Sequence, residues 1–158
     1  MASTKTNVMR LLEQSHIPYE TITYEVDESD LSGTHVANQL NQPVEQVFKT
    51  LVACGESKKH YVFCIPVAEE LDLKKTAKLI KEKKIEMLPV KELQSVTGYI
   101  RGGCSPIGMK KKFPTYIDET AILFDKIFVS AGIRGMQVVI NPNDLISYVS
   151  ATLADLVK

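Results

Sequence analysis

Glycine is concentrated in one stretch of this sequence, Thr97–Gly108, which reads TGYIRGGCSPIG. The stretch holds four of the eight glycines in a chain of 158 residues. Glycine lets the backbone approach a ligand closely or take a positive φ, at an added entropic cost of folding. The stretch therefore predicts one of two things. It is either a turn-rich loop with a structural role, or a pocket wall whose backbone N–H groups face a negatively charged or carbonyl oxygen.

A single lysine interrupts the most apolar predicted strand, Val47–Cys54. Both faces of this strand are largely apolar, which is typical of an interior strand. Lys49 shares its face with Val47, Leu51 and Ala53. Burial of an ammonium group is costly unless the group is paired or opens onto solvent. Lys49 therefore either extends to solvent from a sheet edge or stands in a cleft, where it could bind a carboxylate, carbonyl or phosphate oxygen.

No common short motif for zinc, dithiol exchange, nucleotide phosphates or a serine nucleophile is present in the sequence. The three histidines are scattered and lack partners at metal-ligand spacing, so we predict neither a metal nor a cofactor. Cys104 lies inside the glycine-rich stretch, but no histidine is near it in sequence, and a small buried thiol is the commoner role. An enzyme with these residues would act by positioning and oxyanion stabilisation.

Composition indicates an ordinary globular protein, with 44% hydrophobic and 24% charged residues. The length fits one domain over residues 1–158. No apolar run approaches the roughly 20 residues of a membrane-spanning helix, and the first residues lack the apolar core of a secretory signal. The three cysteines form no disulfide framework. We therefore expect a cytoplasmic protein without a membrane partner.

Charge is unevenly distributed although the net charge is zero. Residues 1–50 carry seven acids and three bases, whereas residues 58–112 carry thirteen bases and six acids. Lys74, Lys78 and Lys81 recur at helical spacing, and Lys110–Lys112 directly follow the glycine-rich stretch. Such a basic field can attract a polyanion such as a phosphate backbone, but solvated lysine faces are also common on exposed helices.

Apolar periodicity predicts a mixture of helices and strands without a regular βαβ repeat. Expected helices cover 6–15, 33–40, 73–84, 88–95 and a segment that begins at Pro142. In the helix over 73–84, Leu73, Ala77 and Ile80 are expected to face the core. Expected strands cover 19–26, 47–54, 61–67, 115–117, 126–130 and 136–140, with turns at 55–59 and 130–135. This order predicts an α/β (mixed) fold: a curled, mostly antiparallel mixed sheet or barrel surrounded by helices.

Four ordered motifs resemble those of the YbaK/EbsC family, freestanding relatives of the editing domain inserted in bacterial prolyl-tRNA synthetases. The motifs are Phe48-Lys49-Thr50-Leu51, Leu73-Lys74-Lys75, the stretch from Thr97-Gly98-Tyr99 through Gly102–Gly108, and Ser130–Gly135. The resemblance spans nearly the whole chain and implies the YbaK-type editing fold. It also implies hydrolysis of the aminoacyl ester of mischarged tRNA, chiefly Cys-tRNA(Pro), by a cytoplasmic protein that acts with tRNA and prolyl-tRNA synthetase and uses no metal.

The resemblance also implies roles for individual residues. Catalytic roles fall on Lys49, Gly102 and Gly103, and substrate-binding roles fall on Tyr24, Thr50, Ser105 and Ser130. Lys49 would bind the substrate or the terminal adenosine, the two glycines would hold the ester carbonyl, Tyr24 would form a wall and Ser130 would donate a hydroxyl. The attacking group in this family is the thiol of the substrate cysteine, which cyclises onto the ester and can leave as a thiolactone.

Two positions depart from the family pattern. Ser32 stands before Gly33 where better-known members carry phenylalanine, and Gln137 stands where some members carry an acid. One small apolar contact changes discrimination by only ~1–3 kcal/mol, so the choice among cysteine, alanine, serine and proline is open. Two other functions also stay open: a non-catalytic module that binds tRNA or a synthetase, and a small-molecule-binding regulator in which Lys49 pairs with a carboxylate or phosphate.

Overall fold

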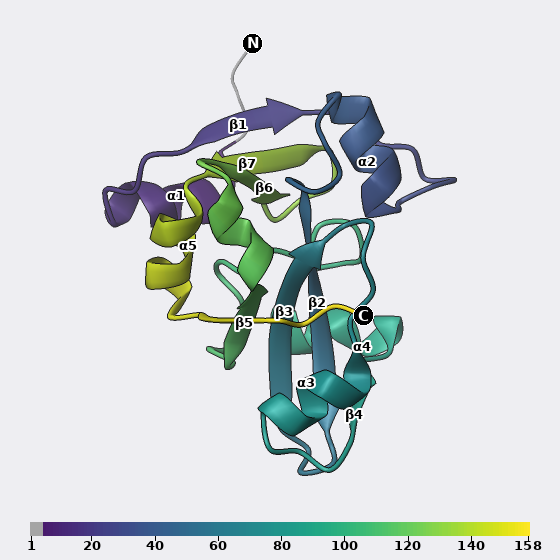
Figure 1. Cartoon of the computed structure of the whole chain (residues 1–158). Coiled ribbons are helices and arrows are strands. Elements are labelled where there is room, and N and C mark those ends of the chain that lie inside the picture. Colours follow the sequence, from purple (N-terminus) through teal and green to yellow (C-terminus); the bar gives the residue numbers. More distant parts are fainter. Residues whose placement is uncertain (1–4) are drawn as a thin grey trace.

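The computed structural model describes residues 5–158, which form two β-sheets flanked by helices (Figure 1). The three-stranded sheet has the order β1-β7-β6 and contains β1 (Glu20–Thr23), β7 (Met136–Ile140) and β6 (Ile127–Ser130). The five-stranded sheet has the order β4-β2-β3-β5-β8 and contains β4 (Ile85–Met87), β2 (Phe48–Gly55), β3 (His60–Pro66), β5 (Thr115–Asp118) and β8 (Thr152–Ala154). The helices are α1 (Asn7–Gln14), α2 (Gly33–Leu40), α3 (Leu73–Leu79), α4 (Val90–Thr97), η1 (Glu119–Leu123) and α5 (Pro142–Val149).

The mixed, mostly antiparallel arrangement is confirmed. Both pairings in the three-stranded sheet are antiparallel, and β2 is antiparallel to β3 and β4, whereas β5 runs parallel to β3 and β8. Over residues 5–158 the two sheets do not close into a barrel; an isolated parallel bridge between Val47 and Phe128 joins them. β2 lies between β3 and β4, as its apolar faces predict.

Local sequence explains where several elements begin. Thr6 caps α1 by accepting a hydrogen bond from the Met9 N–H, and Asn141 caps α5 in the same way through the Asn143 N–H, with Pro142 at the first helical position. α4 begins at Val90, two residues later than expected, because a residue that precedes proline, here Leu88, avoids helical geometry. It ends at Thr97, because Gly98 caps it with a left-handed φ of 87°.

Two expected elements were too long. The helix expected over 73–84 ends at Leu79, because Ile80 caps it and Lys81 has a φ of 61°. The following segment forms β4 on the edge of the five-stranded sheet, and Leu73, expected in the core, is 37% exposed. The strand expected over 19–26 pairs with β7 only over Glu20–Thr23. Tertiary pairing, which these local patterns do not encode, sets both ends.

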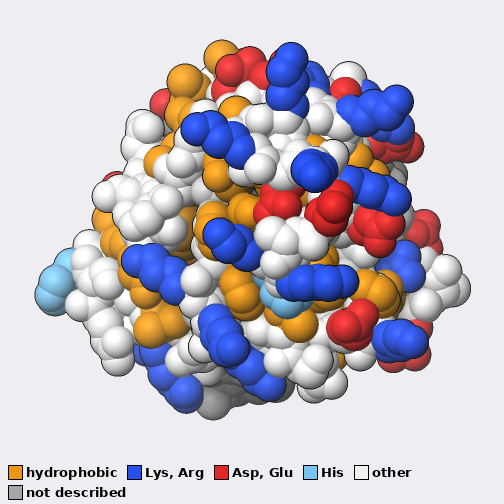
Figure 2. Space-filling view, turned by 90° about the horizontal axis from the view of Figure 1, so that it is seen from below, with side chains coloured by type: hydrophobic (Ala, Val, Ile, Leu, Met, Phe, Trp, Pro, Cys, Tyr) orange, Lys and Arg blue, Asp and Glu red, His pale blue; other side chains and the backbone are white. Residues whose placement is uncertain are grey.

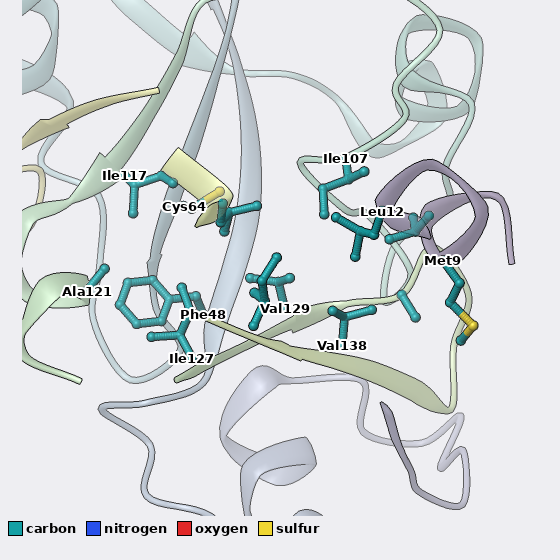
Figure 3. Close-up of a cluster of buried hydrophobic side chains, with 14 of the residues drawn as sticks. Met9, Leu12, Phe48, Cys64, Ile107, Ile117, Ala121, Ile127, Val129 and Val138 are labelled. Atoms are coloured by element: carbon teal, nitrogen blue, oxygen red, sulfur yellow. The ribbon is translucent and has the colours of Figure 1, made fainter. Parts of the chain in front are cut away.

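The largest buried cluster fills the space between the two sheets (Figure 3). Phe48 and Cys64 enter it from the five-stranded sheet, and Val129 and Val138 enter from the three-stranded sheet. Met9 and Leu12 of α1 cover one side of it. Complete burial of one such aliphatic side chain stabilises the fold by about 1.5–3 kcal/mol. This core therefore fixes the orientation of one sheet relative to the other.

A second cluster lies on the opposite face of the same junction. Val36, Ala37 and Leu40 of α2 pack on Val47, Val67, Phe128 and Val139. α2 thus covers the point at which Val47 and Phe128 bridge the two sheets. None of the helices over residues 5–158 combines the length and apolarity needed to cross a bilayer.

Candidate functional site

A cavity of about 420 Å³ opens beside this junction. Its walls come from α2 and the residues before it, from β2, from the ends of β6 and β7, from α4 and from the glycine-rich loop. The apolar part of the wall includes Leu31, Val36, Val47, Val67, Leu88, Val90 and Leu93. Among the described residues that line the cavity, Lys49 and Arg101 are charged, and no lining residue is acidic.

Strand register explains how polar side chains reach the cavity. Ser130 of β6 lies directly opposite Gln137 of β7. Lys49 and Ser130 each follow, by two residues, a member of the Val47–Phe128 bridge, so both point to the same face as that bridge. Lys49, Ser130 and Gln137 therefore form a polar row across three strands, next to the apolar residues that α2 covers. All three line the cavity.

Lys49 is partly buried and carries a free charge toward this space. None of the ion pairs within 4 Å among the described residues includes Lys49. Burial lowers its pKa, and the more distant carboxylates of Glu70 and Glu69 oppose this effect. The ammonium group is thus available to an oxygen ligand that enters the cavity, because no protein carboxylate neutralises it at close range.

The glycine-rich loop packs against the Ser130–Gly135 turn. Gly102 lines the cavity and has a φ of +88°. Residues other than glycine rarely adopt such a φ. A Cβ added to Gly103 would lie 3.1 Å from the Ile133 carbonyl carbon and 3.2 Å from the Arg134 nitrogen. The Arg134 guanidinium donates a 2.8 Å hydrogen bond to the Arg101 carbonyl oxygen. These contacts hold loop and turn together at the cavity wall.

The structure brings together five of the seven predicted site residues. Tyr24, Lys49, Thr50, Gly102 and Ser130 line the cavity. Gly103 and Ser105 are not among its lining residues. The Gly103 N–H donates to the Ile100 carbonyl at 3.0 Å, and the buried Ser105 hydroxyl accepts the Ile107 N–H at 3.3 Å. In this structure both residues shape the loop from within.

Sequence reasoning did not assign several other cavity residues. Arg101 lines the cavity, and the only sequence signal for it was its position in the glycine-rich stretch. Leu88 and Leu93 come from the α4 region, which the sequence predicted as a helix without any functional mark. Their role depends on how α4 packs beside β2, which neither periodicity nor motif reveals.

Cys104 also lines the cavity, but its chemistry is unfavourable for nucleophilic attack. Burial raises the pKa of the Cys104 thiol to about 12 and that of the neighbouring Cys64 thiol to about 12 as well. A thiol with such a pKa carries almost no thiolate at neutral pH, and the thiolate is the nucleophile.

We therefore expect Cys104→Ala to retain, within about threefold of the unmodified protein, the deacylation that the family resemblance implies, because the thiol has no chemical step to perform. Initial rates on a charged tRNA measure this directly. Thr97 opposes part of the effect of burial on the pKa of the Cys104 thiol, so Thr97→Val serves as a control for polarity at the same place. A complete loss of turnover in a folded Cys104→Ala protein would restore a mechanism based on the protein thiol.

Residues 32–148 match the sequence pattern of the aminoacyl-tRNA editing domain. The chain belongs to this family. One relative, from Enterococcus faecalis (strain ATCC 700802 / V583), carries the name "Putative Cys-tRNA(Pro)/Cys-tRNA(Cys) deacylase EbsC". It is 47% identical over 152 residues, which cover 96% of this chain and 93% of the relative. The resemblance to the YbaK/EbsC family is thereby confirmed.

Solved structures agree with this editing-domain fold. A protein described as a "putative trans-editing enzyme for prolyl tRNA synthetase" superposes with a TM-score of 0.82 at 24% identity, over 99% of both chains. A second solved structure, of a hypothetical protein, superposes with a TM-score of 0.87 at 17% identity, over 96% of this chain and 99% of the other. At these identities the two matches establish the fold alone.

The two departures from the family pattern both lie in the wall of the editing-domain cavity. Ser32 caps α2 by accepting the His35 N–H at 3.4 Å, so its hydroxyl serves the helix. Gln137 is only 6% exposed, and its side-chain oxygen Oε1 has no hydrogen-bond partner among the described residues. The first departure has a local structural function; the second leaves a buried acceptor unused.

Proposed function

We propose that this editing domain hydrolyses the aminoacyl ester of mischarged tRNA and that Cys-tRNA(Pro) is its principal substrate. The observation that carries the proposal is the pairing of an ammonium group without an ion-pair partner, Lys49, with the glycine-rich loop in one cavity that has no acidic lining. Ester cleavage develops negative charge on the carbonyl oxygen, and cations or N–H groups aimed at that oxygen stabilise the transition state.

Lys49 and Gly102 are proposed as the groups that face the ester. The Gly102 N–H makes no hydrogen bond within residues 5–158, whereas the Gly103 N–H is already used inside the loop. Gly102 is therefore the better candidate to hold the carbonyl, and Gly103 acts by allowing the loop to approach the Ile133–Arg134 backbone. Tyr24, Thr50 and Ser130 complete the cavity wall around the aminoacyl group.

The attacking sulfur is proposed to come from the substrate. The thiol of the cysteinyl group loses its proton and forms a bond to its own carbonyl carbon, the bond from that carbon to the ribose oxygen breaks, and the oxygen takes up a proton. The resulting thiolactone then reacts with water. An ordinary cysteine side chain has a pKa of about 8.5, so a substrate thiol is far better ionised at neutral pH than the buried Cys104.

The basic surface supports an encounter with tRNA. Lys and Arg side chains spread across the face viewed in Figure 2, between apolar groups and with acids toward one side. In the sequence, residues 58–112 contain thirteen basic and six acidic residues. Such a surface attracts a phosphate backbone, and the attraction weakens as salt rises. We further propose transient action beside prolyl-tRNA synthetase in the cytoplasm, with all of residues 1–158 in one editing domain.

The test is a panel of tRNA(Pro) charged separately with cysteine, alanine, serine and proline. We expect loss of the cysteinyl ester well above the buffer rate, little loss of the alanyl ester, and an apparent KM that rises with salt. Alanine is the sharp comparison because it lacks only the sulfur atom. No ester loss on any of the four would refute the enzyme, and tight salt-sensitive tRNA binding in that case would favour the non-catalytic module.

A further inference from the structure

One buried acceptor in the cavity wall has no use in the folded protein. Gln137 is only 6% exposed. Its Oε1 is one of two buried side-chain atoms in residues 5–158 that have no hydrogen-bond partner. A buried polar atom without a partner costs free energy. The other such atom, Thr76 Oγ1, lies in α3 away from this cavity, whereas Gln137 lines it.

The hydroxyl groups of Ser32, Thr50 and Ser130 in the wall already have partners. Ser130 Oγ accepts the Gly132 N–H at 3.1 Å, Ser32 Oγ caps α2, and Thr50 Oγ1 contacts Cys64 Sγ at 3.7 Å. The described lining contains no carboxylate. A cationic group that enters this cavity therefore meets neutral acceptors only. Among the described lining side chains, Gln137 Oε1 is the buried oxygen without a hydrogen-bond partner.

An aminoacyl ester brings such a cation with it. Its α-amino group is protonated near neutral pH and must keep hydrogen bonds when it leaves water. Register places Gln137 directly opposite Ser130, and Lys49 continues the same row. The two ends of the row therefore prefer opposite ligand groups. Lys49 prefers an oxygen that accepts a hydrogen bond, and Gln137 Oε1 prefers a hydrogen-bond donor. The terminal torsion of glutamine is broad and low in energy, so Oε1 can turn toward a donor.

We propose that Gln137 recognises the α-ammonium group of the substrate and so selects aminoacyl esters with a free amino group. This inference rests on the proposed function and names the part of the substrate that the same cavity reads. It predicts that esters whose amino group is absent or blocked, including peptidyl esters, bind poorly.

Stable amide analogues test this without turnover. The first is 3′-amino-3′-deoxyadenosine acylated on its 3′-nitrogen with cysteine, and the second is its 3-mercaptopropionyl counterpart, which lacks only the α-amino group. We expect the unmodified protein to bind the first about tenfold or more tightly, the range of a hydrogen bond to a charged group. In Gln137→Met, which keeps the side-chain length and removes the acceptor, we expect the two Kd values to become equal.

Thermal stability distinguishes a role of Gln137 in substrate recognition from a role in maintaining the fold. Gln137→Met should keep or raise Tm, because an apolar group replaces a buried unpaired one. Thr76→Val is the matched control: it removes the other unpaired buried oxygen and should leave the ratio of the two Kd values unchanged. Gln137→Glu, which retains an acceptor, should preserve the preference for the free amino group and serves if the Met variant fails to fold.

Each outcome decides the inference. An unchanged Kd ratio in Gln137→Met, or a collapsed ratio in Gln137→Glu, would overturn it while leaving the deacylase proposal intact if the unmodified protein still cleaves Cys-tRNA(Pro). Failure of the unmodified protein to bind either analogue would also overturn it. The proposed function itself is refuted only by the absence of ester cleavage, whether or not the analogues bind.

Discussion

Lys49→Ala is expected to lower the rate of Cys-tRNA(Pro) deacylation by at least about 100-fold. Loss of one charged group aimed at a developing oxyanion removes roughly 3 kcal/mol of transition-state stabilisation, and each 1.4 kcal/mol is a factor of about ten in rate. The protein should remain folded, with Tm unchanged or raised, because no carboxylate within 4 Å pairs with this partly buried ammonium in the described residues.

Single-turnover rates with saturating protein, together with thermal unfolding, measure these two effects. Lys126→Ala is the matched control, since Lys126 is exposed and pairs with Glu20 on the surface at 3.3 Å. It should lose little activity, because exposed ion pairs contribute only about 0–1 kcal/mol. Lys49→Arg keeps the charge but changes its shape and is expected to recover only part of the rate. Full activity in Lys49→Ala would remove the central residue of the proposed mechanism.

Gly103→Ala is expected to lower turnover by about three- to tenfold although Gly103 does not line the cavity. The added Cβ would meet backbone atoms, at 3.1 Å from the Ile133 carbonyl carbon and 3.2 Å from the Arg134 nitrogen. Backbone cannot yield as a flexible side chain can, so the loop must move away from the turn and carry Gly102 with it. A displacement of about 1 Å in a positioning group can cost 100-fold in rate, so the few tenths of an ångström that these contacts require correspond to a loss of about three- to tenfold.

The control for Gly103→Ala is Gly108→Ala in the same loop. Gly108 has a φ of +78° and an added Cβ there would lie 3.0 Å from Leu11 Cδ1, away from the lining of the 420 Å³ cavity. Both variants should therefore lose stability, by about 1–3 kcal/mol in chemical denaturation. Only Gly103→Ala should lose most of its kcat per folded molecule. Equal losses of kcat in the two variants would show that the loop acts through stability alone.

Local sequence predicted the elements of this site better than their assembly. The apolar β2 with its one lysine, the turn into β3 and the cap of α5 follow from side chains that are neighbours in the chain. The same reasoning gave a pocket wall as one of two interpretations of the glycine-rich loop, and the structure places Gly102 in the lining of the cavity. The reasoning also placed Leu73 in the core, where the structure exposes it, because periodicity names the apolar side of a helix without stating what covers it.

The polar row of the cavity could not be predicted from any single segment. Lys49, Ser130 and Gln137 share a face only because Val47 pairs with Phe128 across the two sheets. The sequence marked Gln137 as a departure from a family pattern, yet its significance lies in an unpartnered oxygen that only the packing of β7 produces. Burial and hydrogen-bond partners are tertiary properties.

The bridge between Val47 and Phe128 also bears on the order of events during synthesis. It joins segments from the first and last thirds of the chain, and the cavity beside it draws on residues from Tyr24 to Gln137. Closure of a long chain segment is entropically unfavourable and contacts between distant residues form slowly. A nascent chain that has released β2 and the hairpin partner β3 from the ribosome still lacks β6 and β7. Editing competence therefore arises only after β7 has emerged and paired.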